Sequence, residues 1–101
     1  MNARRVALLP IARDDIEEIY LYVAADNPGA AVALTDKILA RIDSLESLPL
    51  IGKIVPDAEL AKRDYRMLVV DDYLVFYRVV DDIVVVYRVL HGARDYPYLL
   101  K

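Results

Sequence analysis

The feature that most constrains the fold is a series of three apolar runs rich in Val, Tyr and Ile, near residues 64–70, 73–80 and 83–91. Only Asp71-Asp72 and Asp81-Asp82 separate them. β-Branched and aromatic residues favour extended backbone, and a short polar break between two such runs indicates a turn. The three runs therefore predict consecutive strands that pair antiparallel.

The two Asp-Asp breaks also predict the register, because two-residue loops pair the flanking residues, Val70 with Tyr73 and Val80 with Ile83. One sheet face then carries Arg66, Leu68, Val70, Tyr73, Val75, Tyr77, Val84, Val86, Arg88 and Leu90. The other carries Tyr65, Met67, Val69, Leu74, Phe76, Arg78, Val80, Ile83, Val85, Tyr87, Val89 and His91. Both faces are strongly apolar, so we expect one of them to be left uncovered and to bind a partner.

The first half of the sequence predicts a short strand and a helical hairpin. Residues 4–9 are apolar enough for a strand, which Pro10 ends. Apolar residues then recur at helical spacing, and Asn27-Pro28 supplies an N-cap and a proline for the start of a second helix. The first stripe contains Ala12, Ile16, Ile19, Tyr20 and Val23, and the second contains Ala31, Leu34, Ile38, Ile42 and Leu45. With only residues 25–27 between them, the two helices should pack antiparallel.

The order of elements is therefore β-α-α-β-β-β, with residues 49–62 as a loop. This order predicts an α+β fold in which an antiparallel sheet packs against the helical hairpin. A chain of 101 residues suits one compact domain over residues 1–101.

The composition excludes several classes of protein. The chain has no cysteine and one histidine, so we expect neither a metal site nor a cofactor. It contains no run of about 18 apolar residues, the length that a membrane span needs. The basic start at residues 1–5 is followed by Pro10 and carboxylates, which does not fit a signal peptide. We expect a cytoplasmic protein that does not enter a membrane.

The charge balance argues against a protein that grips nucleic acid. Thirteen Lys and Arg against sixteen Asp and Glu leave a net charge of −3. Affinity for a nucleic-acid backbone comes largely from neutralised phosphates, and a basic surplus normally accompanies it. A local basic patch in the second half of the chain stays open.

These segments together resemble the RelE/ParE toxins of bacterial toxin–antitoxin pairs. The resemblance rests on the first helix with Asn27-Pro28, on Leu48-Pro49 with Gly52, on the strands at residues 65–68 and 75–79, and on the ending at residues 87–95. It covers residues 4–96 in the family's order. The ending, Tyr-Arg-Val-Leu-His-Gly-Ala-Arg-Asp, is the most specific piece.

The resemblance implies a toxin that a neighbouring gene's antitoxin holds inactive in a hetero-oligomer. RelE-like members of the family cut messenger RNA in the ribosome, whereas ParE-like members poison DNA gyrase. The acidic balance and the form of the ending favour the ParE-like branch, with a ParD-like antitoxin, DNA gyrase as target and no enzymatic activity. The alternatives are a RelE-like, ribosome-dependent mRNA interferase and a non-toxic protein-binding module.

RNA cleavage without a metal needs a general base, a cation for the phosphorane and an acid for the leaving oxygen. If the chain is RelE-like, the candidates are Arg66, Arg78, Tyr87, Arg88, His91 and Arg94. The structural alternative is that His91 ends a strand and bonds the backbone. In the same way, Arg78 and Arg88 would pair with Asp81, Asp82 or Asp95. We favour the structural alternatives and no catalytic residue.

The surplus apolar surface predicts that the antitoxin lays an amphipathic helix, with or without an added strand, in a groove between hairpin and sheet. The predicted antitoxin-binding residues are Ile19, Tyr20, Val23, Leu34, Ile38, Leu45, Tyr73, Val75 and Tyr77. The predicted target-binding residues are His91, Arg94, Tyr96 and Tyr98.

Overall fold

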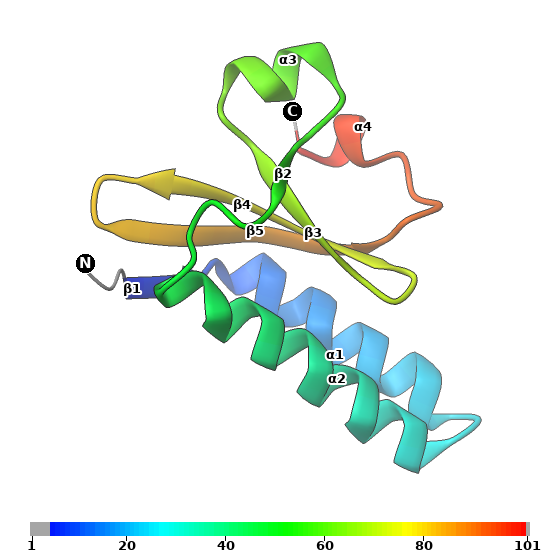
Figure 1. Cartoon of the computed structure of the whole chain (residues 1–101). Coiled ribbons are helices and arrows are strands. Elements are labelled where there is room, and N and C mark those ends of the chain that lie inside the picture. Colours follow the sequence, from blue (N-terminus) through cyan, green and yellow to red (C-terminus); the bar gives the residue numbers. More distant parts are fainter. Residues whose placement is uncertain (1–4, 101) are drawn as a thin grey trace.

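A computed structural model describes residues 5–100; residues 1–4, which include the start of the predicted first strand and most of the basic segment, lie outside the described part. The elements are β1 (Arg5–Leu8), α1 (Pro10–Ala24), α2 (Pro28–Asp43), the 3-10 turn η1 (Ser44–Glu46), β2 (Lys53–Ile54), α3 (Ala58–Lys62), β3 (Arg66–Val70), β4 (Tyr73–Val80), β5 (Ile83–His91) and α4 (Tyr96–Leu100). The strands form one sheet in the order β1-β5-β4-β3-β2, with α1 and α2 against one face (Figure 1). The predicted α+β class is confirmed.

The helical hairpin forms as the sequence predicts. Asn27 begins α2 by accepting a hydrogen bond from Ala30 N–H at 3.1 Å, which satisfies one of the free amides of the first turn. The apolar stripes of both helices pack on the sheet in one core that includes Ala12, Ile19, Ile38, Ile42, Leu45, Leu68, Val75, Tyr77, Val84 and Val86. Burial of this stripe is what holds the hairpin to the sheet.

The first strand departs from the prediction of an antiparallel sheet. β1 pairs with β5 in parallel, with Arg5 opposite Ile83 and Leu8 opposite Val86. The other strand pairs are antiparallel. The apolar pattern identified residues 5–8 as a strand but carries no information on which strand it joins, because its partner lies about 80 residues further along the chain.

Both predicted turns and their register are confirmed. Val70 pairs with Tyr73 and Val80 pairs with Ile83. The first residue of each turn is in the left-handed region, with φ of 53° at Asp71 and 54° at Asp81. Aspartate tolerates this conformation better than most residues, which explains why Asp-Asp can serve here without glycine.

A β-bulge in β5 overturns the predicted distribution of side chains near its end. Phe76 pairs with Arg88 whereas the next residue, Tyr77, pairs with Val86, so that Tyr87 is an extra residue of β5. The bulge turns Val89 into the core beneath the helices and Leu90 onto the opposite face. Both assignments are the reverse of the prediction, because an uninterrupted period of two cannot anticipate an extra residue.

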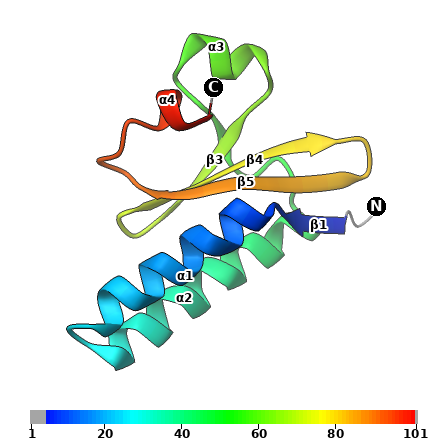
Figure 2. The same ribbon diagram turned by 180° about the vertical axis from the view of Figure 1, so that it is seen from behind.

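The second face of the sheet is also more covered than the sequence predicted. Residues 49–62 are not a plain loop, since they contain β2 and α3, and the segment after β5 ends in α4. Figure 2 shows α3 and α4 on the side of the sheet opposite α1 and α2. Together they enclose a second core of Val55, Leu60, Tyr65, Met67, Phe76 and Leu90. The apolar surface left on this face is therefore small and includes Val69 and Val80.

Candidate partner-binding groove

The helical hairpin extends beyond the sheet at the end where the β3–β4 turn and the end of β5 lie (Figure 1). Two depressions open there, of about 550 Å³ and about 380 Å³, and both are lined by Asp72 and Tyr73. The larger one lies against α1, and the smaller one lies against α1 and α2. We call the two together the Tyr73 groove.

The Tyr73 groove has an apolar floor and a charged rim. Its apolar lining includes Ile19, Tyr22, Val23, Leu34, Tyr73, Val89 and Leu90. Tyr22 is 80% exposed although it belongs to this apolar surface. At the rim Lys37 binds Asp71 at 3.0 Å, and the larger depression also meets Glu18, His91 and Arg94. Such a surface suits an amphipathic segment, which buries apolar side chains and keeps charged ones in water.

A buried ion pair adjoins the groove, and its carboxylate, Asp15, lines the larger depression. Arg88 Nε and Nη2 donate to the two carboxylate oxygens of Asp15 at 2.7 and 2.9 Å, and Val89 N–H donates to Asp15 Oδ2 at 3.0 Å. The pair connects α1 to the bulged part of β5. The hydrogen bonds that Arg88 donates to Asp15 raise the pKa of Arg88 above its ordinary value, against the opposing effect of burial. The predicted partners Asp81, Asp82 and Asp95 are thus wrong for Arg88.

Asp15 was not identified as a site residue from the sequence, although its position on the apolar stripe of the first helix indicates a buried ion pair. It follows the apolar Ala12 by three residues and precedes Ile19 by four, so it lies on the buried stripe of α1. A carboxylate on a buried stripe needs a partner, because an unpaired charge is expensive to bury. The sequence could have indicated a buried pair but not which arginine supplies it.

His91 is held as the structural alternative predicted. It ends β5 and is exposed, its Nδ1 accepts a hydrogen bond from Ala93 N–H at 3.1 Å, and its ring packs edge-on against Tyr73 at 5.4 Å. An acceptor at Nδ1 places the proton of the neutral ring on Nε2. The nitrogen that is left to face solvent is then a donor, which does not suit a general base.

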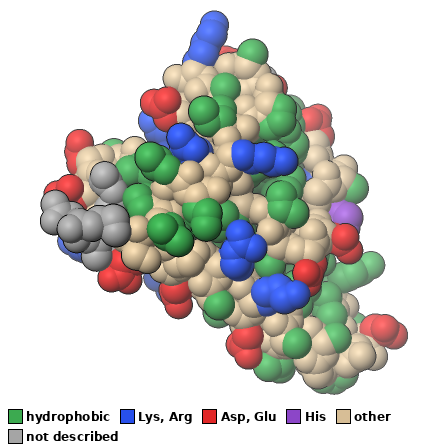
Figure 3. Space-filling view, in the orientation of Figure 1, with side chains coloured by type: hydrophobic (Ala, Val, Ile, Leu, Met, Phe, Trp, Pro, Cys, Tyr) green, Lys and Arg blue, Asp and Glu red, His purple; other side chains and the backbone are tan. Residues whose placement is uncertain are grey.

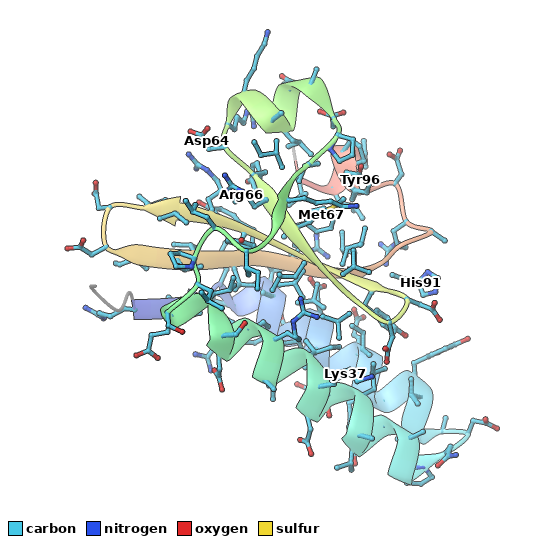
Figure 4. All side chains as sticks on the ribbon, viewed as in Figure 1. Lys37, Asp64, Arg66, Met67, His91 and Tyr96 are labelled. Atoms are coloured by element: carbon cyan, nitrogen blue, oxygen red, sulfur yellow. The ribbon has the colours of Figure 1, made fainter. Side chains whose placement is uncertain are left out.

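Of the other residues of the predicted RelE-like set, Arg94 lies beside His91, but Arg66, Arg78 and Tyr87 lie away from it. Arg66 Nη1 donates to Gly52 O at 2.8 Å at the start of β3, far along the sheet from His91 (Figure 4). Arg78 Nε donates to Arg63 O at 2.7 Å, so the pairing predicted for Arg78 is also wrong, and its Nη1 reaches the Tyr87 hydroxyl at 3.4 Å on the second face. The RelE-like candidates are therefore distributed over both faces of the sheet and one of its edges.

Arg66 belongs to a cluster that anchors the segment before β2. Gly52 N–H donates to the buried hydroxyl of Tyr77 at 2.8 Å, and Gly52 O accepts the bond from Arg66. A Cβ at Gly52 would lie 2.6 Å from that hydroxyl and 2.8 Å from Met67 O, so only glycine fits. Burial raises the pKa of the Tyr77 hydroxyl, with smaller opposing effects from Gly52 and Arg66.

The structure corrects part of the predicted antitoxin-binding set. Ile38, Leu45, Val75 and Tyr77 are fully enclosed in the core between hairpin and sheet and offer no surface to a partner. Ile19, Val23, Leu34 and Tyr73 line the Tyr73 groove, and Tyr20 is exposed on α1 outside it. The groove therefore lies at one end of the hairpin, since direct packing on the sheet closes the rest.

The predicted target-binding residues separate into two groups. His91 and Arg94 lie together at the rim of the groove, where Arg94 N–H donates to His91 O at 2.9 Å. Tyr96 instead packs on Phe76 in the second core, with ring centroids 4.9 Å apart. Tyr98 is 79% exposed on α4.

Residues 5–100 contain neither a metal-binding cluster nor a membrane-spanning helix. No three His, Asp or Glu side chains of this part of the chain come together in a way that could hold a metal ion. None of its helices is long and apolar enough to cross a membrane.

Comparisons with known proteins agree with this architecture. The chain is similar to the toxin–antitoxin system ParDE of P. aeruginosa, with a TM-score of 0.72, 18% identity, and coverage of 88% of this chain and 96% of that one. It is also similar to the toxin–antitoxin complex RelBE2 from Mycobacterium tuberculosis, with a TM-score of 0.65, 26% identity, and coverage of 93% and 97%. A comparison with curated proteins finds no match.

The sheet order and the helical hairpin are thus those of the RelE/ParE toxins of type II toxin–antitoxin systems. Residues 6–96 match the sequence profile described as the ParE toxin of the type II toxin–antitoxin system parDE. The chain belongs to this ParE toxin family.

Proposed function

We propose that the chain is the toxin of a pair whose ParD-like antitoxin neutralises it by seating an amphipathic helix in the Tyr73 groove. The observation that carries this proposal is the depression between α1, α2 and the end of the sheet, whose apolar lining leaves Tyr22, Val23 and Tyr73 partly exposed. An apolar surface that stays open after folding marks a partner site. Four of the nine residues predicted from the sequence, Ile19, Val23, Leu34 and Tyr73, line it.

The proposed target of the free toxin is DNA gyrase, in the cytoplasm. Arg66, Arg78 and Tyr87 lie away from His91 and Arg94, which supports an inhibitor over a ribonuclease, because acid–base catalysis requires its groups around one reacting phosphate. Two further observations support the same choice: His91 Nε2 is a donor, and Arg88 is held by two hydrogen bonds to Asp15. His91, Arg94 and Tyr98 are accessible for the target, whereas Tyr96 would act by holding α4 on Phe76.

Expression of the chain in growing cells tests the proposed function. DNA, RNA and protein synthesis are followed separately after induction, with and without the protein of the neighbouring reading frame. We expect DNA synthesis to stop first and the neighbouring protein to restore growth. Immediate arrest of protein synthesis would favour the RelE-like activity, and undisturbed growth would favour a non-toxic binding module.

Two neighbouring residues of α1 test the groove itself. Tyr22 and Leu21 are 80% and 58% exposed, but only Tyr22 lines the Tyr73 groove. We expect Tyr22→Glu to weaken antitoxin binding at least about tenfold, since an interface aromatic commonly contributes more than 1 kcal/mol. Leu21→Glu should bind normally. Equal behaviour of the two variants would place the antitoxin elsewhere.

A further inference from the structure

The second face of the sheet carries a guanidinium group held beside two aromatic rings. Arg78 Cζ lies 5.6 Å from the ring centre of Tyr65 and 5.9 Å from that of Tyr87, and the two rings meet edge-on at 5.2 Å. Arg78 Nε donates to Arg63 O at 2.7 Å, and Arg78 Nη1 reaches the Tyr87 hydroxyl at 3.4 Å. These contacts hold the guanidinium in one place, so the side chain has little freedom left to lose when a partner binds.

The groups that hold Arg78 do not neutralise its charge, because a carbonyl and a phenol accept its hydrogen bonds. Burial raises the pKa of the Tyr65 hydroxyl, and Tyr87 acts in the same direction. The charges of Arg78 and Arg63 oppose this shift, so both guanidinium groups lie near a phenol that keeps its proton. Arg63 also pairs with Glu59 at 3.6 Å, an exposed contact of the kind that contributes little. Two cations therefore lie close together beside uncharged rings.

Aliphatic side chains adjoin these cations on the same face. Arg78 pairs with Val85 across the β4–β5 ladder, and Val80, two residues beyond Arg78, is 39% exposed. Residues two apart on a strand point to the same face of the sheet. Figure 3 shows basic and hydrophobic side chains next to each other between α3 and the β4–β5 turn, with acidic side chains at the turn itself. We call this surface the Arg78 patch, and its members are Arg63, Tyr65, Arg78, Val80, Val85 and Tyr87.

The surroundings of the Arg78 patch favour a protein partner over a nucleic acid. Asp64 directly precedes Tyr65 in the chain, and Asp81 and Asp82 directly follow Val80. A nucleic-acid backbone, which carries a charge at every phosphate, would meet these carboxylates next to the patch. A polypeptide can instead place one carboxylate against the cations and apolar side chains against the valines.

We propose that the Arg78 patch binds a segment of DNA gyrase that presents a carboxylate beside apolar residues. The inference rests on the proposed function, because it names the surface on which the same target docks. The patch shares the second face of the sheet with α4 and its exposed Tyr98, which was predicted to contact the target (Figure 2). The antitoxin groove is instead lined by α1 and α2, on the other side of the sheet. An antitoxin in the groove would cover His91 and Arg94 at its rim, so neutralisation requires no contact with the Arg78 patch.

Binding of the purified toxin to purified DNA gyrase tests the Arg78 patch. Arg78→Gln should weaken this binding at least about tenfold, since arginine is often an interface residue whose loss has an effect of this size. Arg63→Gln removes the neighbouring charge from an exposed side chain and should weaken binding several-fold with a reduced dependence on salt. Arg13→Gln, at an exposed position of α1, is the matched control and should bind gyrase normally.

The affinity of the same variants for the protein of the neighbouring reading frame separates this inference from the proposed function. We expect both patch variants to keep that affinity. Arg63→Gln decides the test if urea denaturation shows that Arg78→Gln is unstable, because the Arg63 side chain is exposed.

Each other outcome has a definite meaning. If the unchanged toxin binds gyrase and Arg63→Gln binds it as well as Arg13→Gln does, the inference is wrong and the proposed function stands. A loss of antitoxin affinity in Arg63→Gln would place the patch in the antitoxin interface and overturn the inference. Binding of the toxin to plasmid DNA without gyrase, lost in Arg78→Gln, would show a nucleic-acid site and also overturn it. No binding of the unchanged toxin to gyrase would reject both the inference and the proposed target.

Discussion

Removal of the Asp15 carboxylate should strongly destabilise the protein. In Asp15→Ala, the Arg88 guanidinium keeps its buried position but loses two hydrogen bonds of 2.7 and 2.9 Å, and Val89 N–H loses its acceptor at 3.0 Å. The two side chains are only 6% and 15% exposed, so water can replace little of what is lost. Leaving one partner of a buried pair unpaired costs about 3–5 kcal/mol.

The expected loss of unfolding free energy in Asp15→Ala is about 3 kcal/mol, the lower end of that range, because Arg88 keeps some access to solvent. For a domain of this size, a loss of about 3 kcal/mol lowers the thermal midpoint by roughly 12–24 °C. Urea denaturation of the purified toxin measures the free energy directly. Asp14→Ala is the matched control, since the neighbouring carboxylate is exposed and its removal should change stability by less than about 0.5 kcal/mol.

A double variant separates the cost of an unpaired charge from the value of the pair. Asp15→Leu with Arg88→Met should recover much of the loss, because apolar replacements of a buried pair are often tolerated, with Val89 N–H still lacking its acceptor. A loss below about 1 kcal/mol in Asp15→Ala would refute the reasoning, since it would mean that Arg88 finds water or another partner at little cost.

Three other changes have expected outcomes. Gly52→Ala should cost about 1–3 kcal/mol in urea denaturation, because its Cβ would meet the Tyr77 hydroxyl and Met67 O; unchanged stability would contradict the close approach. Tyr77→Phe should cost about 1–2 kcal/mol at neutral pH by leaving Gly52 N–H unpaired. Burial raises the pKa of Tyr77, so the folded state holds the phenol proton more tightly than the unfolded state does. The resulting contribution to the free energy of unfolding is complete below about pH 10 and is lost as the pH rises above it. In a pH series of denaturation curves, Tyr77→Phe should therefore lose less stability at alkaline pH than the unchanged protein. His91→Ala should cost less than about 1 kcal/mol, because the side chain is exposed, and should reduce toxicity only modestly, because Nε2 is not placed to act as a base. Complete loss of toxicity with unchanged antitoxin affinity would reveal a catalytic histidine.

Most elements could be predicted from the sequence because their signals are local. The spacing of Ala12, Ile16 and Ile19 along α1 and the Asn27-Pro28 start of α2 each depend on a few adjacent residues. The same is true of the two Asp-Asp turns, whose register the structure confirms. Local patterns of this kind persist because tertiary packing agrees with them.

The features that the sequence could not supply depend on distant partners. The parallel pairing of β1 with β5 and the Asp15–Arg88 pair each join residues more than 70 positions apart. The bulge at Tyr87 exists where Arg88 turns toward that carboxylate, and no property of the strand itself marks the extra residue. The prediction of the binding site was limited in the same way, because it also depends on how distant segments pack. The groove-lining residues were identified from apolar periodicity, but periodicity cannot distinguish Leu34, at the groove, from Ile38, one turn further and fully buried.

The effect of the purified chain on DNA gyrase tests the proposed function most directly. Relaxed plasmid, gyrase and ATP are mixed with the toxin, and a parallel reaction contains a programmed ribosome with its messenger RNA. We predict that supercoiling stops or cleaved DNA accumulates, that an excess of antitoxin reverses the effect, and that the messenger RNA stays intact. Codon-positioned cuts in the messenger RNA, with supercoiling unaffected, would contradict the account and assign the chain a RelE-like activity.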